Sequence, residues 1–308
     1  MTDTALFLQQ LINGLSLGAM YALLALGFTL VYGILELINF SHFNVFMVGS
    51  FIAMWVLQMF GLTGQDVILT GLPLAMVLLV AFVATMLGSG IIGVLIERLC
   101  LRPLRNVKGP AAMITTIGVS YILFNFILLT AGAENLNYPN PMPQIQYHIE
   151  GAVLDLRVVL IWIVAVVLML ALHFFVQKSR IGKAMRATAQ DAEAARMMGV
   201  EVDKVVVMAF FLGSALAGAA GLIFGIYYNF TSFIIGFTAG LRAFTAAVLG
   251  GIGNVPGAML GGVIIGLIEA LGGQIAGEWT DVIIFSILVL VLVFKPTGLL
   301  GRMAPNKS

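Results

Sequence analysis

Long stretches without a charged side chain alternate with short charged clusters along the 308-residue chain. A helix needs about 20 apolar residues to cross the hydrocarbon core of a bilayer. Seven stretches reach that length and an eighth is shorter: 4–35, 37–65, 67–96, 109–133, 158–177, 205–241, 243–268 and 282–294. They are far longer than the roughly 10-residue alternating strands of a membrane barrel. The pattern predicts an all-α integral membrane protein, a polytopic helical bundle with one transmembrane domain over residues 1–308.

The composition agrees, because 61% of the residues are hydrophobic and only 9% are charged. The basic residues are unevenly placed: four lie in 98–108, six in 178–204 and three in 295–307, which together are 13 of the 15 Lys and Arg. Loops rich in Lys and Arg stay in the cytoplasm. We therefore expect these three segments inside. The segment 131–157 carries one basic residue, at its end, and three prolines between 139 and 143, so we expect an external loop with room for a short extended hairpin.

The charge pattern also sets the expected number of crossings. Three stretches precede the basic loop at 98–108, which places the N-terminus outside, and the basic residues at 295–307 place the C-terminus inside. Hydropathy alone gives eight crossings. An odd number is needed to bring the C-terminus inside, and 233–253 is the only candidate for a ninth, short and interrupted by glycine. We expect eight or nine transmembrane helices.

The basic segment 178–204 differs from the rest of the chain. Its residues 182–198 include good helix formers and no proline, which predicts one amphipathic helix. Met185, Ala192, Ala195 and Met198 are expected to share its apolar face. Gly199 suits the left-handed position after a helix end, and Asp203 suits the N-cap of the next span. Such a helix either lies on the bilayer with its basic residues near anionic lipid, or serves as a cytoplasmic handle for a soluble partner.

A glycine-rich run at 249–257 cannot form a continuous helix, because it holds Gly250, Gly251 and Gly253 followed by Pro256. It is neither a Walker loop nor a dinucleotide-binding loop, since the required lysine and the preceding strand are absent. It is either a tight turn on the inner side or a break that lines a pathway.

Polar residues inside the expected spans form two groups. Asn39, His42 and Asn44 cluster at the first turn, where His42 either lines a pathway or bonds a backbone carbonyl. Arg242 and Glu269 lie in neighbouring late spans and are expected to pair.

The chain shows no set of residues typical of an enzyme. One cysteine, Cys100, and three scattered histidines supply no metal site, and a Gly-x-Ser-x-Gly nucleophile elbow is absent. We expect no catalytic residue, metal or cofactor, and no nucleic-acid partner.

Several segments resemble a known family. Glu193-Ala194-Ala195 with Gly199 resembles the coupling loop of ABC importer permeases. Three further landmarks resemble the LivH-type branched-chain amino acid permeases: Gly14 to Gly33 followed by Ile38-Asn39-Phe40-Ser41-His42; Glu97-Arg98 with Arg102-Pro103-Leu104-Arg105; and Gly240 to Gly253 with Gly257 and Gly261. These landmarks cover nearly the whole chain in order.

The resemblance implies a plasma (inner) membrane permease for hydrophobic amino acids, built as two repeats. The implied partners are two cytoplasmic ATP-binding subunits, a second related permease, an external solute-binding protein and the lipid bilayer. The implied ATPase contact comprises Arg186, Asp191, Glu193, Ala194, Ala195, Arg196 and Gly199. Candidate pathway or gating residues are Asn39, His42, Phe43, Asn44, Arg242, Gly250, Gly251 and Gly253.

One position departs from the family pattern. Phe43 stands where a glycine is expected after the histidine, which narrows or reshapes any passage there and leaves the substrate open. A sister importer for amides, urea or sugars is therefore an alternative. A second alternative is a secondary transporter driven by an ion gradient, for which Glu36, Arg242 and Glu269 are the candidate ionisable groups.

Overall fold

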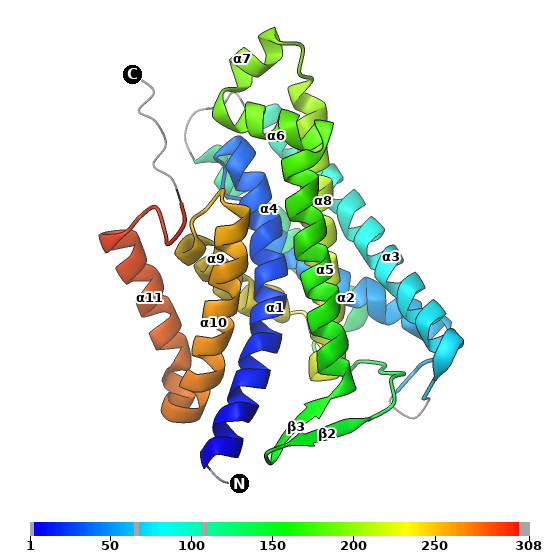
Figure 1. The fold of residues 1–308 in the computed structure, drawn as a ribbon. Coiled ribbons are helices and arrows are strands. Elements are labelled where there is room, and N and C mark those ends of the chain that lie inside the picture. The colour runs from blue at the N-terminus through cyan, green and yellow to red at the C-terminus, as the bar shows by residue number, and fades with distance from the viewer. Residues whose placement is uncertain (1–2, 65–67, 106, 108–109, 302–308) are drawn as a thin grey trace.

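The structure is a computed structural model that describes residues 3–64, 68–105, 107 and 110–301 (Figure 1). Its α-helices are α1 (Asp3–Leu35), α2 (Ser41–Met59), α3 (Gly71–Ile96), α4 (Ala111–Ala131), α5 (Leu156–Lys178), α6 (Arg180–Gln190), α7 (Ala192–Met197), α8 (Val202–Tyr228), α9 (Ile235–Gly250), α10 (Val255–Ala276) and α11 (Thr280–Phe294). Short π or 3-10 turns are η1 (Glu97–Leu101), η2 (Arg102–Leu104) and η3 (Gly277–Trp279). The strands are β1 (Leu136–Asn137), β2 (Gln146–Ile149), β3 (Ala152–Asp155) and β4 (Phe230–Thr231).

The chain is a multi-pass helical membrane protein. Within the described residues, seven helical stretches are long and apolar enough to span a bilayer, and α9 is a shorter apolar helix. The seventh stretch, Val255–Phe294, contains both α10 and α11, which η3 separates. The eight or nine crossings and the sidedness expected from the sequence stay predictions.

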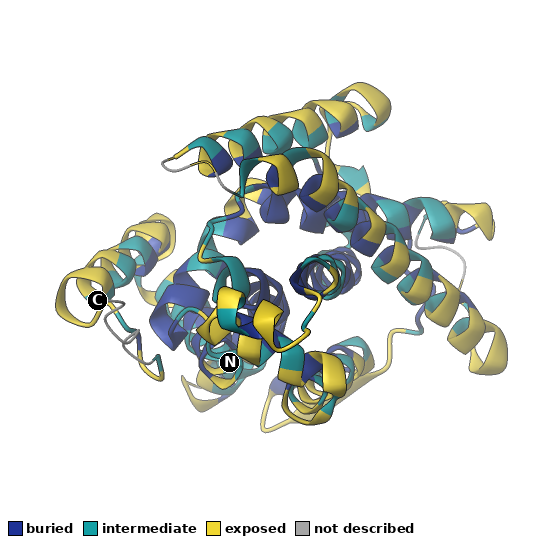
Figure 2. Cartoon of the chain, turned by 90° about the horizontal axis from the view of Figure 1, so that it is seen from above, coloured by how far each residue is buried: buried dark blue, intermediate teal, exposed yellow. Residues whose placement is uncertain are grey.

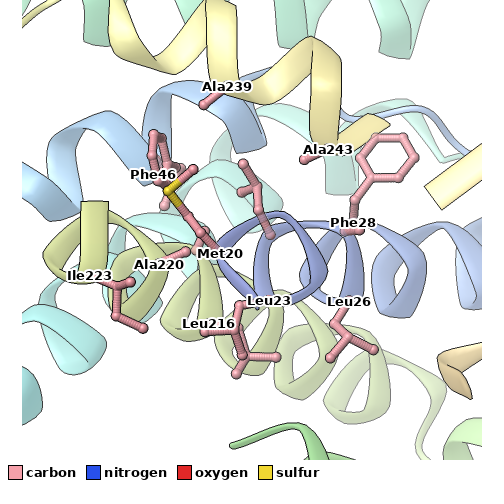
Figure 3. Packing of buried hydrophobic residues seen from close by; sticks show 14 of the residues in the cluster. Met20, Leu23, Leu26, Phe28, Phe46, Leu216, Ala220, Ile223, Ala239 and Ala243 are labelled. Carbon is pink, nitrogen blue, oxygen red and sulfur yellow. The ribbon is translucent and has the colours of Figure 1, made fainter. Parts of the chain in front are cut away.

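The core lies around α1 and α8. Seen from above, buried residues gather on the central helices, while the outer helices are exposed on their outward faces (Figure 2). Met20 and Leu23 of α1 pack against Leu216 and Ala220 of α8 (Figure 3). Both helices are rich in Gly, Ala and Ser on their buried sides, and small residues let membrane helices approach closely.

The two ends of the bundle differ in charge. The end that carries α6 and α7, here called the basic end, holds most of the described cations (Figure 1): Arg98, Arg102, Arg105, Lys178, Arg180, Lys183, Arg186, Arg196, Lys204 and Lys295. The opposite end, here called the hairpin end, carries β2, β3 and the start of α1. Lys108, Arg302 and Lys307, which also entered the charge argument, lie outside the described residues.

Two antiparallel helix pairs connect the first and second halves of the chain. Gly14 and Gly18 of α1 face Leu267 and Val263 of α10, so these helices are antiparallel. Reciprocally, α8 packs antiparallel on α3 of the first half, because Gly93 faces Ser214 while Gly218 faces Ser89. The helices α1 and α8 thus each pack on a helix of the other half of the chain.

The connections after α1 and α8 repeat the same local structure. Glu36 follows α1 and Asn229 follows α8, and both adopt the left-handed conformation, with φ of 54° and 57°. Three residues later, Asn39 and Ser232 each accept a hydrogen bond from the backbone N–H two residues further along. Equivalent side chains thus shape equivalent breaks in the two halves.

The first of these breaks returns the chain to the interior. His42, at the start of α2, lies 3.2 Å from the carbonyl oxygen of Leu24. Leu24 precedes the end of α1 at Leu35 by about 16 Å of helix. The chain therefore leaves the basic end and begins α2 inside the bundle. Broken backbone at this depth is tolerated only where protein or water satisfies it.

The segment 131–157 contains the expected hairpin. Strands β2 and β3 pair antiparallel, with Gln146 opposite Asp155 and Ile149 opposite Ala152. The hairpin is attached to α1, because the backbone N–H of Val153 donates to Gln9 Oε1 at 2.8 Å. Strand β1 pairs with β4, which joins this segment to the end of α8.

Asp155 caps α5 at the base of the hairpin. Its carboxylate accepts from the Arg157 backbone N–H at 2.9 Å and from Arg157 Nη2 at 2.6 Å. Partial burial alone would raise the pKa of Asp155, but the hydrogen bonds and charge of Arg157 hold the pKa below its ordinary value.

The stabilisation by ionised Asp155 should therefore be complete above its unfolded pKa of about 3.9 and disappear as the pH falls through the lower folded pKa. Hydrogen exchange of residues 146–157 should accelerate across that acidic window. Asp155→Asn should abolish this pH step while retaining the cap. Glu150→Gln, at the hairpin tip, should leave the step unchanged; a step that survives Asp155→Asn contradicts the assignment.

Candidate functional site

The basic segment forms two helices that project from the basic end (Figure 1). The single helix predicted over 182–198 is wrong, because Asp191 is extended, with φ −156° and ψ 107°, between α6 and α7. Its Oδ1 accepts from the backbone N–H groups of Glu193 and Ala194, both at 2.9 Å. Aspartate favours such capping over a helix interior. The segment is therefore a bent pair of helices.

Helix α6 is fastened to the end of α5. Ser179 caps α6 by accepting from the backbone N–H of Gly182 at 2.8 Å. Arg186 Nη1 donates to the carbonyl oxygens of Val176 and Gln177. These carbonyls would otherwise be unsatisfied at the end of α5. Arg186 thus holds the segment to the membrane body, so its predicted place in the ATPase contact would be indirect.

Helix α7 is the outermost part of the segment. Glu193 and Arg196 are exposed, and Met197 and Met198 are 84% and 85% exposed. The prediction that Met198 shares the apolar face is wrong, because the bend at Asp191 changes the register between α6 and α7. Ala195 is buried, as expected. Exposed methionines beside charged residues are typical of adaptable contact surfaces.

Gly199 ends α7 in the predicted left-handed conformation, with φ of 85°. The backbone N–H of Val200 donates to the carbonyl of Ala195 at 3.0 Å, and that of Gly199 donates to Arg196 at 2.9 Å. This pair of bonds is the Schellman motif, which stops a helix at a glycine. The motif fixes the position of α7 relative to the start of α8.

The sequence predicted that Asp203 caps α8, and this prediction is wrong. Helix α8 begins at Val202, one residue earlier, and Asp203 instead pairs with Arg102 and Arg105. Arg105 Nη1 lies 2.7 Å from Asp203 Oδ1, and its Nη2 contacts the fully buried Glu97. This Glu97–Arg105–Asp203 network joins the end of α3 to the start of α8, beside the projecting helices.

The glycine run forms a compact turn at the basic end. The backbone N–H groups of Leu299 and Leu300 donate to the carbonyls of Leu249 and Gly250, at 2.7 and 3.0 Å. A Cβ on Gly251, whose φ is 107°, would collide with the backbone of Gly301. Close backbone packing explains Gly250 and Gly251. Gly253 borders a cavity of about 490 Å³ that Arg186 also lines, so the turn lies next to the projecting segment.

The first polar group is buried at the break between α1 and α2. Asn39 Oδ1 accepts from the backbone N–H of Ser41 at 3.1 Å. His42 lies against the Leu24 carbonyl, and Asn44 Nδ2 donates to the carbonyl of Ser120 at 2.8 Å. Each side chain makes a contact that supports the broken backbone. The structural interpretation of His42 fits this geometry, and a role in a pathway stays a prediction.

Phe43 lies in an aromatic cluster inside the bundle. Its ring stacks on Phe28, with centroids 6.1 Å apart, and Phe28 meets Phe244 edge-on at 5.3 Å. Gly240 faces the Phe43 ring, and a Cβ there would collide with it. The large side chain that departs from the family pattern is thus accommodated by a glycine on α9, and it fills the space between α1, α2 and α9.

Arg242 joins four helices. Its Nη1 lies 2.6 Å from Glu269 Oε1 of α10, which confirms the predicted pair. It also donates to the hydroxyl of Tyr21 on α1 at 3.4 Å, and its Nε and Nη2 donate to Asp281 Oδ1 of α11 at 3.1 and 2.7 Å.

Sequence reasoning missed Asp281 and Tyr21. The isolated acid at the start of the last apolar run was the available signal for Asp281. Among the described residues, no group of three or more His, Cys, Asp or Glu is arranged to hold a metal ion.

Comparisons with known proteins identify the family. Residues 10–292 match the family model described as "Branched-chain amino acid transport system / permease component". The chain belongs to this family. It is 42% identical to the LivH high-affinity branched-chain amino acid transport system permease protein of Escherichia coli, over 98% of this chain and 97% of the relative.

Other members are similar over nearly their full length. The chain is 40% identical to the BraD permease protein of Pseudomonas aeruginosa, over 98% of both chains. It is 29% identical to a probable branched-chain amino acid transport permease protein of Methanocaldococcus jannaschii, over 91% of this chain and 88% of the relative. No solved structure matches the chain. The relatives are transport permease components, which agrees with the lack of enzyme motifs in the sequence.

Proposed function

We propose that the chain is a membrane-spanning subunit of an ATP-binding-cassette importer for branched-chain or other hydrophobic amino acids. The observation that carries the proposal is the α6–α7 pair, which projects from the membrane body with an exposed, charged and methionine-bearing tip. The near-complete alignment with LivH and BraD supports the substrate class.

The proposed partners are assigned by the two ends of the bundle. Two ATP-binding subunits dock on α7 at the basic end, one on this chain and one on a second, related permease. Segments rich in Lys and Arg favour the cytoplasmic side, so the basic end lies at the cytoplasmic face of the inner (plasma) membrane. A solute-binding protein approaches the hairpin end from outside.

Force from the ATP-binding subunits has a direct route into the bundle. Arg186 ties α6 to the last carbonyls of α5, and the cavity beside it borders the α9–α10 turn. Gly33, near the end of α1, packs against Gly253 of the same turn. Movement of α7 would therefore reach α1, α5 and α9 through packed contacts.

Reversing the charge of Glu193 tests the docking site. The side chain is exposed, so Glu193→Lys should fold and insert normally, and should weaken co-purification of the ATP-binding subunits at least tenfold. Glu134→Lys, an exposed acid in the segment before β1, is the matched control and should co-purify normally. Normal co-purification and transport by Glu193→Lys would remove the coupling assignment.

Uptake by the assembled complex tests the function. Proteoliposomes should accumulate labelled leucine only with ATP and the binding protein, and should ignore proton or sodium gradients. A panel of amides, urea and sugars should compete weakly. Gradient-driven uptake by this chain alone would instead support the secondary-transporter alternative, and strong competition by a sugar or amide would support a sister importer.

A further inference from the structure

A polar cavity of about 570 Å³ lies at the hairpin end, between α1, the end of α8, α9, α10 and α11. Ligand sites in proteins commonly occupy about 300–1,000 Å³. Gln10 and Asn13 of α1 line one wall with Leu17, and Tyr227 and Tyr228 line another. The cavity thus combines amide groups with apolar and aromatic surface.

One cation and three carboxylates lie around this cavity. Arg242 contacts Glu269 and Asp281, while Glu278 lies at the α10–α11 turn. Glu269 contacts Arg242 through Oε1 only, and its buried Oε2 makes no hydrogen bond within the described residues, although the Tyr21 hydroxyl interacts with the same carboxyl group. A buried carboxylate oxygen without a donor is costly, so a positively charged group of a ligand would be favoured there.

The other edge of Arg242 is occupied by an exposed carboxylate. Asp281 Oδ1 accepts from both Nε and Nη2, at 3.1 and 2.7 Å, although its side chain is 55% exposed. The Nε–Nη2 edge of a guanidinium is suited to a carboxylate with two oxygens. Asp281 therefore marks where a second carboxylate can bind, and its exposure lets it be displaced.

We propose that this cavity binds the zwitterionic head of an α-amino acid. The ammonium group bonds Glu269 Oε2, and the carboxylate replaces Asp281 on the Nε–Nη2 edge of Arg242. The aliphatic side chain lies against Leu17. This inference rests on the proposed function, because it names the residues by which the importer holds its substrate class.

The aromatic cluster that contains Phe43 reaches α9 near Arg242 but does not line this cavity. Phe244 lies two residues after Arg242 on α9, and it packs edge-on against Phe28, which stacks on Phe43.

Photo-leucine cross-linking to the assembled complex, without binding protein, tests the site. Cross-links should map to peptides containing Leu17 or residues 270–281. Leucine should compete, whereas leucinol, which lacks the carboxylate, and isocaproate, which lacks the ammonium, should each compete at least tenfold less well.

Two variants with opposite expected effects separate binding from folding. Glu269→Gln should lower cross-linking at least tenfold, because the anionic partner of the ammonium is lost. Asp281→Asn should raise cross-linking severalfold, because the carboxylate that competes for Arg242 is weakened; a purely structural role would lower it. Glu134→Gln is the control and should not change it.

The two proposals fail differently. Cross-links outside the cavity, or cross-linking that Asp281→Asn lowers or leaves unchanged, while ATP-driven leucine uptake continues, would overturn the binding site and leave the proposed function standing. A complex that imports another solute and no amino acid would overturn both.

Discussion

Replacing Gly266 by valine is expected to separate α1 from α10 and abolish the folded bundle. A Cβ at this position would collide with the backbone of Gly18 and of Gly14, which no side-chain rearrangement can relieve. Overpacking of a well-packed core commonly costs about 1–3 kcal/mol, and collision with backbone belongs at or above the upper limit. The purified variant should aggregate in size-exclusion chromatography and lose most of its thermal stability in detergent.

Gly118→Val is the matched control for this prediction. Gly118 is also a helical glycine in an apolar span, on α4, but nothing lies within 4 Å of the Cβ that would be added. Its stability should change by no more than about 0.5 kcal/mol. Equal losses for the two variants would mean that α1 and α10 are not in contact as described.

Arg105→Gln is expected to have the second largest effect. Arg105 is 14% exposed and pairs with Glu97, whose side chain is fully buried, as well as with Asp203. Removing one partner of a buried ion pair leaves an uncompensated charge and costs about 3–5 kcal/mol. We expect a large loss of stability in denaturant titrations, with α3 detaching from the start of α8.

Arg102→Gln provides the comparison that isolates burial. Arg102 pairs with the same Asp203 but is 49% exposed, and exposed pairs contribute about 0–1 kcal/mol. The variant should be nearly as stable as the parent protein. If Arg102→Gln were as destabilising as Arg105→Gln, the network at the basic end would not depend on the burial of Glu97.

Charge-free stretches and clustered cations predicted the helical class and the basic segment, and the prolines of 131–157 predicted a loop with the β2–β3 hairpin, because each depends on local composition. They also predicted the Arg242–Glu269 pair, since two opposite charges in neighbouring spans have few other partners. The motifs of the first landmark indicated an important region around Asn39 and His42. They could not show that α2 begins inside the bundle.

Other features depend on tertiary contacts that no local pattern records. The bend at Asp191 arises because its side chain competes with the helix, although every neighbouring residue favours helix. Asp203 pairs with Arg102 and Arg105, about one hundred positions earlier, instead of capping α8. The packing of α1 on α10 and of α8 on α3 is also hidden, because it depends on contacts between residues far apart in the sequence.

The account depends most on the assignment of α7 as the cytoplasmic docking site. Met197 is 84% exposed, so Met197→Cys in a Cys100→Ser background places a single cysteine on the surface of α7. We predict that a membrane-impermeant thiol reagent labels this cysteine only from the cytoplasmic side, and that the assembled ATP-binding subunits protect it. The account would be contradicted if the cysteine were labelled from outside intact cells. It would also be contradicted if the cysteine in an actively transporting complex were labelled as strongly as without the ATP-binding subunits.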